Sequence, residues 1–203
     1  MTVPFGARLR EAMGAYGPFC AGLDPHRGLV EAWGLDYSLA GLERFALTCV
    51  EAFGGQVAVV KPQSAFFEVF GSGGIRVLER VLAELRQAGT LSLLDVKRGD
   101  IGSTMQAYAD AYLGKDSDLR ADAITVSPFL GYASLRPALD LAEETGAGVF
   151  VLALTGYHGW AVGYARKLAA GRPTLAGRTL RLVNEVPALA TVVIVVLVIV
   201  KPF

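Results

Sequence analysis

The stretch LDVKRGDIGSTMQAYADAYL, residues 94–113, determines the fold that we expect for this chain. It continues an apolar run that starts at residue 91, and it ends in a helical pattern. Three charged residues stand between the two: Asp95, Lys97 and Asp100. In parallel α/β folds, reacting groups gather where strands end, because side chains from several strands converge there without entering the packed core. Asp95 and Lys97 are two residues apart, so on a strand both point to the same face.

The composition indicates one neutral globular domain. The chain has 203 residues, 53% of them hydrophobic, and its 19 basic residues balance 19 acidic ones. This length permits a single domain with a large core. A neutral chain without a basic run lacks the positive surface that nucleic-acid binding requires. We therefore expect no nucleic-acid partner.

The N-terminus and the cysteines indicate a cytoplasmic protein. Residues 1–17 have the pattern of a short amphipathic helix, without a long apolar segment and a cleavage site. Cys20 and Cys49 lie in apolar segments, which favours buried thiols in a reducing compartment over a disulfide. We expect no association with a membrane.

Apolar runs alternate with helical patterns along the chain. We expect strands at residues 19–23, 57–60, 91–96, 123–126 and 149–154, and helices at 38–53, 75–88, 100–113 and 135–144. Ser38 is a suitable N-cap for the first of these helices. Short, fully apolar strands separated by helices are typical of a parallel sheet covered on both faces. Such a sheet is either a closed barrel or an open, doubly wound sheet.

Two observations favour the barrel. No glycine-rich phosphate-binding turn follows the first strand, where a dinucleotide-binding sheet would carry one. Polar residues also stand at the ends of four different predicted strands: Asp24, Lys61, Asp95 with Lys97, and Ser127. In a barrel, one ring of strands shares one mouth, so several strands would contribute to a single site.

Most of these residues also have a structural interpretation. Asp24 can begin a turn, Lys61 can be a solvated strand end, and Asp100 can stabilise a helix N-terminus. The functional interpretation depends on the set as a whole. His26 and His158 have no ligand-like spacing with each other or with carboxylates, so we predict no metal site.

The motif Asp95-x-Lys97-x-x-Asp100-Ile101 resembles the orotidine 5'-phosphate decarboxylase family, in its mycobacterial-type bacterial subgroup. Three further segments make the resemblance specific: GLDP at residues 22–25, VKPQSAFFE at 60–68 and SPFLGY at 127–132. The likeness extends from the N-terminus to about Thr155.

The resemblance implies a (β/α)8 TIM barrel that converts orotidine 5'-monophosphate to UMP and CO2 in pyrimidine biosynthesis, without a metal or an organic cofactor. It implies a charge array of Lys61, Asp95 and Lys97, in which Lys97 protonates C6 of the pyrimidine. Asp100 would complete this array from the second subunit of a homodimer.

The resemblance also assigns the substrate contacts. Asp24 and Lys61 would hold the ribose, Thr104 would contact it from the neighbouring subunit, and Ile101 would pack near the base. The substrate-binding residues implied in this way are Asp24, Ile101, Thr104, Ser127 and Thr155.

Two other functions remain open at this point. A metal-dependent sugar-phosphate decarboxylase of the same superfamily would share the Asp-x-Lys-x-x-Asp motif but carry a carboxylate where Lys61 stands, so that an acid pair could hold Mg²⁺. The chain could also be a truncated, inactive barrel with a binding role or with no function.

The C-terminal segment is the reason to consider a truncated, inactive barrel. We expect residues 1–155 to form the barrel portion, and residues 156–203 to be a divergent or disrupted segment of the same domain. Residues 191–200 predict one more strand, which gives six where a barrel requires eight. The segment could be a truncated or frame-shifted sequence, which we favour, or a piece exchanged with a dimer partner. It could also be a divergent ending, in which phosphate binding falls to one of Arg166, Arg172, Arg178 and Arg181.

Overall fold

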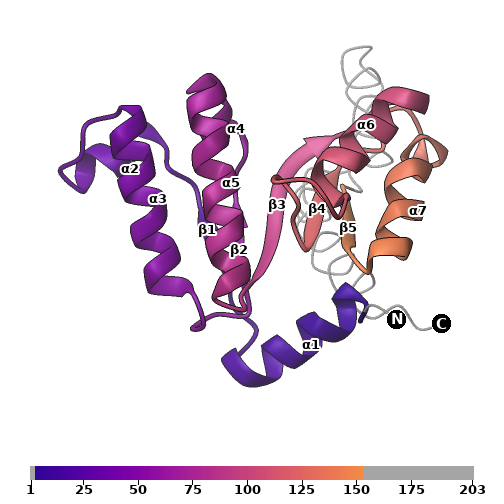
Figure 1. The fold of residues 1–203 in the computed structure, drawn as a ribbon, viewed down its shortest axis with the longest axis horizontal. Helices are drawn as coiled ribbons and strands as arrows, with labels where there is room; N and C mark the ends of the chain where they lie inside the picture. The colour runs from indigo at the N-terminus through magenta and orange to yellow at the C-terminus, as the bar shows by residue number, and fades with distance from the viewer. Residues whose placement is uncertain (1–2, 153–203) are drawn as a thin grey trace, which may run out of the picture.

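The computed structural model describes residues 3–152, which form five parallel strands that alternate with helices (Figure 1). The strands are β1 (Cys20–Leu23), β2 (Val59–Pro62), β3 (Leu91–Arg98), β4 (Ala123–Val126) and β5 (Gly148–Val151). The helices are α1 (Phe5–Tyr16), α2 (Arg27–Ala32), α3 (Leu39–Phe53), α4 (Ala65–Glu68), α5 (Gly71–Gln87), α6 (Gly102–Leu113), the 3-10 helix η1 (Tyr132–Leu135) and α7 (Arg136–Thr145). The five strands predicted between residues 19 and 154 are all present.

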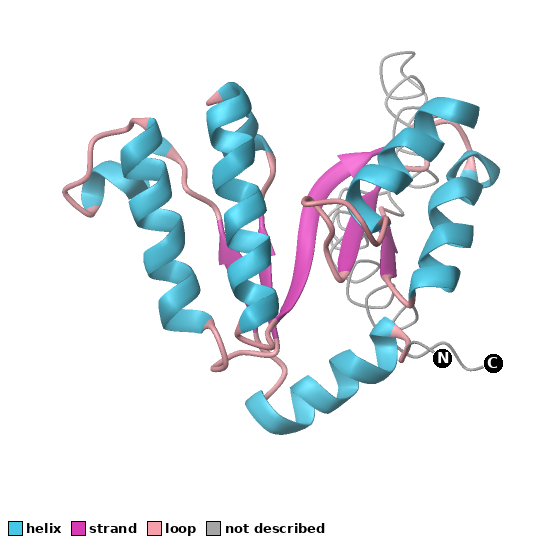
Figure 2. Cartoon of the chain, viewed as in Figure 1, coloured by secondary structure: helices cyan, strands magenta, loops and turns pink. Residues whose placement is uncertain are grey.

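The order of the strands in the sheet follows their order in the chain, from β1 to β5, and all neighbours are parallel. An open doubly wound sheet reverses its strand order at a switch point. A barrel instead adds each strand beside the one before it. The strand order therefore confirms the prediction of a barrel-type winding. Figure 2 shows the strands side by side, with helices flanking them.

The two faces of the sheet have different neighbours, because successive side chains of a strand point to opposite faces. Leu94 and Ile124 are fully buried in a core formed with the helices. In Figure 1 α3 and α5 lie on one flank, and α6 and α7 lie on the other. One residue earlier on the same strands, Leu93 and Ala123 belong to a second core on the inner face. Each leucine buried in this way stabilises the fold by about 1.5–3 kcal/mol.

Helix α1 lies across the end of the sheet at which the strands begin (Figure 1). Phe5 and Leu9 are buried there against the inner-face residues of β3 and β4. Arg8 pairs with the carboxylate of Asp122, whose other oxygen accepts hydrogen bonds from the backbone N–H and the hydroxyl of Ser92, at 2.9 and 3.0 Å. This helix therefore covers the end opposite to the predicted site.

Helix boundaries differ from the prediction where glycines are involved. Ser38 caps α3 as predicted, because its Oγ accepts a hydrogen bond from the Gly41 N–H at 3.2 Å. Helix α5, however, begins at Gly71 rather than near residue 75. A Cβ at Gly74 would lie 1.9 Å from the carbonyl oxygen of Phe67, so glycine lets α5 start tightly against α4. The glycine run had the propensity of a loop, but close packing determines its conformation.

The prediction for the two cysteines is half right. Within residues 3–152 both are free thiols, and Cys49 is buried, but Cys20 is exposed. Ala21 and Leu23 of β1 are buried in the core beneath the helices, so alternation turns the Cys20 side chain to the other face. Burial raises the pKa of Cys49 to about 11, which keeps this thiol protonated and unreactive.

Some predictions lie outside the described residues. They concern the segment 156–203 as a whole, the strand at 191–200, Thr155 and the four arginines considered for phosphate binding. Across residues 3–152, no helix has the length and apolar character needed to cross a membrane.

Candidate active site

Alternation along β2 and β3 places the charged residues on the inner face of the sheet. Leu93 faces inward, so Asp95 and Lys97 follow on the same side of β3, as predicted. Val59 faces inward on β2, and Lys61 follows it two residues later. The two strands are neighbours, and all three charged side chains meet at the end where the strands finish.

Asp95 is the centre of this group. Its Oδ2 lies 2.5 Å from Nζ of Lys97 and 3.3 Å from Nζ of Lys61. The Asp95 side chain is only 9% exposed, whereas those of Lys97 and Lys61 are 50% and 29% exposed. One carboxylate therefore separates two cations at the mouth of the sheet, with the ammonium group of Lys97 the more accessible to a ligand.

Two neutral side chains complete the surroundings of Asp95. Gln63 donates from Nε2 to Asp95 Oδ2 at 2.9 Å, and Thr125 donates from Oγ1 to Asp95 Oδ1 at 2.7 Å. Neither residue was predicted from the sequence. A signal was present, because each is a polar residue on the inward parity of its strand: Gln63 comes two residues after Lys61, and Thr125 two after Ala123.

The surroundings of Asp95 favour its ionised form. Burial alone would raise the pKa of this carboxyl group. The hydrogen bonds from Lys97 and Thr125, together with the positive charges of Lys61 and Lys97, outweigh burial and hold the pKa below its ordinary value. Asp95 is therefore a carboxylate throughout the physiological pH range.

Asp24 lies at the edge of the same group. Its Oδ1 is 4.0 Å from Nζ of Lys61, and its side chain is 40% exposed. It follows β1 directly, and β1 pairs with β2 so that Leu23 lies opposite Pro62. The structure thus brings together four of the predicted residues, Asp24, Lys61, Asp95 and Lys97, from three adjacent strands.

Among the residues that the structure describes, those at the start of α6 are not bonded to this group. Within residues 3–152, no ion pair or hydrogen bond joins Asp100 to Lys61, Asp95 or Lys97; its Oδ1 accepts the N–H of Ile101 at 2.8 Å. Ile101 and Thr104 are exposed. The side chains of Ile101 and Thr104 are therefore accessible to another molecule.

Ser127 lies directly after β4, at the same edge of the sheet, and its N–H donates to the carbonyl of Arg98 at 2.7 Å. The segment that follows it presents large apolar side chains to solvent. The exposed fractions of Phe129, Leu130 and Tyr132 are 81%, 52% and 64%, and that of Ile101 is 60%. We call these four residues the apolar rim.

A metal site has no support in the arrangement of side chains. Residues 3–152 contain no group of three or more His, Cys, Asp or Glu side chains that could hold a metal ion. His26, which was considered for this role, caps α2 by accepting the Leu29 N–H at 3.2 Å. A metal bound between Asp24 and Asp95 would meet the ammonium group of Lys61, which lies near both.

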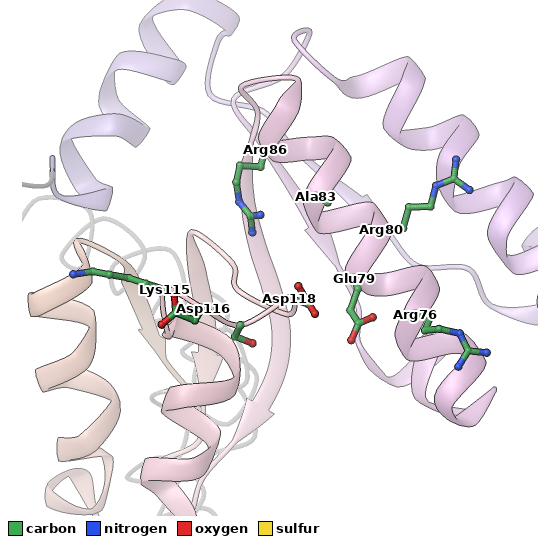
Figure 3. Close-up of a pocket in the computed structure, with 9 residues that line it drawn as sticks. Arg76, Glu79, Arg80, Ala83, Arg86, Lys115, Asp116 and Asp118 are labelled. Carbon is green, nitrogen blue, oxygen red and sulfur yellow. The ribbon is translucent and has the colours of Figure 1, made fainter.

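A charged groove of about 500 Å³ lies elsewhere, between α5 and the segment after α6 (Figure 3). Its lining includes Arg76, Glu79 and Arg86 of α5, with Asp116 and Asp118 facing them from the other side. It is on the helix side of the sheet, and no predicted site residue lines it. The groove is therefore separate from the charge array.

The sequence of this chain is similar to that of known proteins of one family. The sequence model of the orotidine 5'-phosphate decarboxylase / HUMPS family matches residues 17–181. The chain is 63% identical over 152 residues to an orotidine 5'-phosphate decarboxylase of Streptomyces coelicolor, an alignment that covers 75% of this chain and 55% of that protein. It is 65% identical over 153 residues to one from a Nocardioides species, covering 75% of this chain and 56% of the relative. The chain thus spans about half the length of the curated relatives it matches.

Solved structures show the same fold. A candidate orotidine 5'-phosphate decarboxylase from Streptomyces avermitilis superposes with a TM-score of 0.74 at 64% identity, covering 75% of this chain and 53% of that one. Leishmania donovani OMP decarboxylase superposes with a TM-score of 0.61 at 33% identity, covering 73% of this chain and 53% of that one. Residues 17–181, which the family model matches, include all five strands and the four clustered side chains. On these grounds the chain belongs to the orotidine 5'-phosphate decarboxylase / HUMPS family.

Proposed function

We propose that the charge array decarboxylates orotidine 5'-monophosphate to UMP and CO2, a step of pyrimidine biosynthesis, without a metal or an organic cofactor. The observation that carries this proposal is the alternation of charge at one edge of the sheet. The Asp95 carboxylate lies between the ammonium groups of Lys61 and Lys97, and its Oδ2 is within 3.3 Å of both Nζ atoms. The curated relatives that share this region are named for the same activity.

The reaction explains why a lysine stands at position 97. When the bond between C6 and the carboxylate breaks, its electron pair remains in an orbital at C6 that the pyrimidine ring delocalises poorly. A fixed cation beside C6 is worth most at that moment, because the charge develops in the transition state. Lys97 would supply this cation and then transfer a proton from Nζ to C6, and solvent would restore the proton to the amine. CO2 leaves without any redox change.

Asp95 would have two tasks. It would accept a hydrogen bond from the ammonium group of Lys97 and so hold this proton donor in place. It would also stand beside the departing carboxylate of the substrate. Lys61, between Asp24 and Asp95, would bind the ribose together with Asp24.

We further propose that the site is shared between two subunits of a cytosolic homodimer. Asp100 and Thr104 would approach the substrate of the neighbouring subunit, and Ile101 would pack near the base. Ser127 and Thr155 would contact the substrate from the same chain as Lys97. The support is that Ile101 and Thr104 are exposed, and that the apolar rim beside them presents the kind of surface that protein contacts cover.

The metal-dependent sugar-phosphate decarboxylase is disfavoured by Lys61. Such an enzyme needs a second carboxylate at this place, whereas the ammonium group of Lys61 lies 3.3 Å from the first one and would repel Mg²⁺. No observation favours this alternative.

The test is product formation by the purified chain. We expect incubation with orotidine 5'-monophosphate to yield UMP, detected by chromatography, at the same rate with and without EDTA. Loss of UMP formation on adding EDTA, with recovery by Mg²⁺, would support the metal-dependent alternative. A folded chain that yields no UMP in either condition would support the inactive barrel.

A further inference from the structure

Lys97 has an unusual backbone conformation. Its φ of +49° makes it the single non-glycine residue with a positive φ in the described part of the chain. This left-handed region is sterically unfavourable for a side chain such as lysine. A residue keeps such a conformation only where its surroundings enforce it, and strain of this kind clusters at functional sites.

An irregularity in the sheet produces this conformation. Leu94 of β3 pairs with Ile124 of β4, and the next pair is Arg98 with Val126. Three residues of β3, from Asp95 to Lys97, therefore lie opposite the single residue Thr125. A bulge of this kind re-aims side chains next to active sites. Here the bulge contains both Asp95 and Lys97, and Lys97 has its left-handed backbone within it.

The hydroxyl of Thr125 replaces the lost pairing inside the bulge. Its Oγ1 accepts the backbone N–H of Lys97 at 2.9 Å and donates to Asp95 Oδ1 at 2.7 Å. One hydroxyl thus fixes both the backbone nitrogen of Lys97 and the orientation of the Asp95 carboxylate, which Lys97 contacts.

Arg98 fixes the other side of Lys97. Its carbonyl accepts the Ser127 N–H at 2.7 Å, which restores pairing with the chain after β4. Its guanidinium group pairs with Glu68 of α4, and its Cζ lies 5.7 Å from the centre of the Tyr108 ring on α6. Glu68 is itself held by the hydroxyl of Ser64, at 2.6 Å. The side chain of Arg98 therefore anchors the end of β3 between two helices.

We propose that Arg98 is a positioning residue for Lys97: its ion pair with Glu68 holds the end of β3, so that Lys97 keeps the left-handed backbone that directs Nζ to Asp95. Without this anchor, Lys97 would relax to a negative φ, and its ammonium group would leave the carboxylate. The catalytic consequence rests on the proposed function, but the placement of Lys97 does not.

The first test measures the placement of Lys97 without using turnover. The pKa of the Asp95 carboxyl group is followed by carbon-13 NMR in the parent and in Glu68→Ala, with Lys97→Met as the reference for complete loss of the Lys97 contact. Removing a nearby anion by Glu68→Ala would lower the Asp95 pKa by electrostatics alone. Release of Lys97 would raise it, in the direction of Lys97→Met, so the sign of the shift separates the two effects.

The matched control is Glu43→Ala, which breaks the 2.8 Å ion pair between Glu43 of α3 and Arg80 of α5. It removes the same kind of partner from another inter-helix pair, and we expect it to leave the Asp95 pKa unchanged. If Glu68→Ala does not fold, Arg98→Lys decides the question, because lysine keeps the charge but not the planar set of donors. We expect Arg98→Lys to raise the Asp95 pKa as well.

Turnover of orotidine 5'-monophosphate gives the second readout. If the parent is active, we expect Glu68→Ala to lower kcat at least tenfold with less than a threefold change in KM, since Lys97 acts on charge that appears only in the transition state. An inactive parent would count against the proposed function while leaving the NMR test intact. An Asp95 pKa that is unchanged or lowered in folded Glu68→Ala, or unchanged in Arg98→Lys, would overturn the positioning role of Arg98.

Discussion

At the scale of single residues, Asp95 concentrates more interactions than any other group in the site. Its two oxygens accept hydrogen bonds from Lys61, Lys97, Gln63 and Thr125, and its side chain is only 9% exposed. A buried carboxylate is costly unless it is paired and hydrogen-bonded. The contacts with Lys97, Thr125 and Lys61 favour the ionised form, so the same contacts that build the site also link stability to pH.

Asp95→Asn should therefore lose more stability at neutral pH than in acid. The folded-state pKa of Asp95 lies below its ordinary value, so its ionisation stabilises the fold above the unfolded-state pKa of about 3.9. This contribution disappears as the pH falls through the folded-state pKa. We expect parent and variant to differ by about 1–3 kcal/mol at pH 7 and to converge below pH 4. Denaturant unfolding, followed by circular dichroism, measures the free energy of unfolding of the parent and the variant at each pH.

The control for this experiment is Asp140→Asn, which removes the exposed pair between Arg136 and Asp140 on α7. An exposed pair of this type is worth about 0.5 kcal/mol or less. A constant difference between the parent and Asp95→Asn from pH 3 to pH 7 would contradict the linkage.

At the scale of elements, a tight contact at Gly148 brings α1 close to β5. A Cβ placed on Gly148 of β5 would lie 2.5 Å from the ring of Phe5, which is buried beneath the sheet. The Phe5 ring also meets Phe150 edge-on, with 6.0 Å between ring centres. Glycine at position 148 therefore lets α1 approach β5 closely.

Gly148→Ala should destabilise the protein by about 1–3 kcal/mol, because the added methyl group displaces the Phe5 ring from a well-packed position. Gly14→Ala is the matched control. It adds the same methyl group to α1, where no atom lies within 4 Å of the new Cβ. We expect it to stabilise the protein by about 0.5–1 kcal/mol, since alanine is the better helix former. Thermal unfolding measures both effects. Equal shifts in melting temperature for the two variants would contradict the close packing of Phe5 against Gly148.

The sequence predicted the elements of this sheet better than their details. Continuous apolar runs located all five strands, and the period of two correctly placed Asp95 and Lys97 on one face. The bulge in β3 was not predictable, since it depends on how β3 aligns with β4. Thr125 was missed although its inward parity on β4 could be read from the sequence, because an uncharged threonine inside an apolar run has ordinary strand propensity and draws no attention as a site residue.

At the scale of the whole molecule, the described residues supply one part of the proposed site. Asp24, Lys61, Asp95 and Lys97 are together, whereas within residues 3–152 Asp100 makes no ion pair or hydrogen bond with them and the apolar rim is open to solvent. A homodimer with sites shared between subunits would explain both observations.

Mixing two inactive variants tests whether the site is shared. In a heterodimer of Lys97→Ala and Asp100→Ala chains, one of the two sites would regain both native residues. Random exchange of subunits should therefore restore about a quarter of the parent turnover. Heterodimers isolated through two different affinity tags and lacking any turnover would show that each site is built from one chain.

The most direct measurement is the rate at which the purified chain consumes orotidine 5'-monophosphate in the presence of EDTA, followed by absorbance, for the parent and for Lys97→Ala. We expect the parent to turn over and Lys97→Ala to be slower by a factor on the order of 10² or more, with the same circular-dichroism spectrum and melting temperature, because a fixed cation beside C6 is lost. Equal rates for the two chains, or a folded parent without turnover, would contradict the proposal that this charge array is a metal-free decarboxylase site.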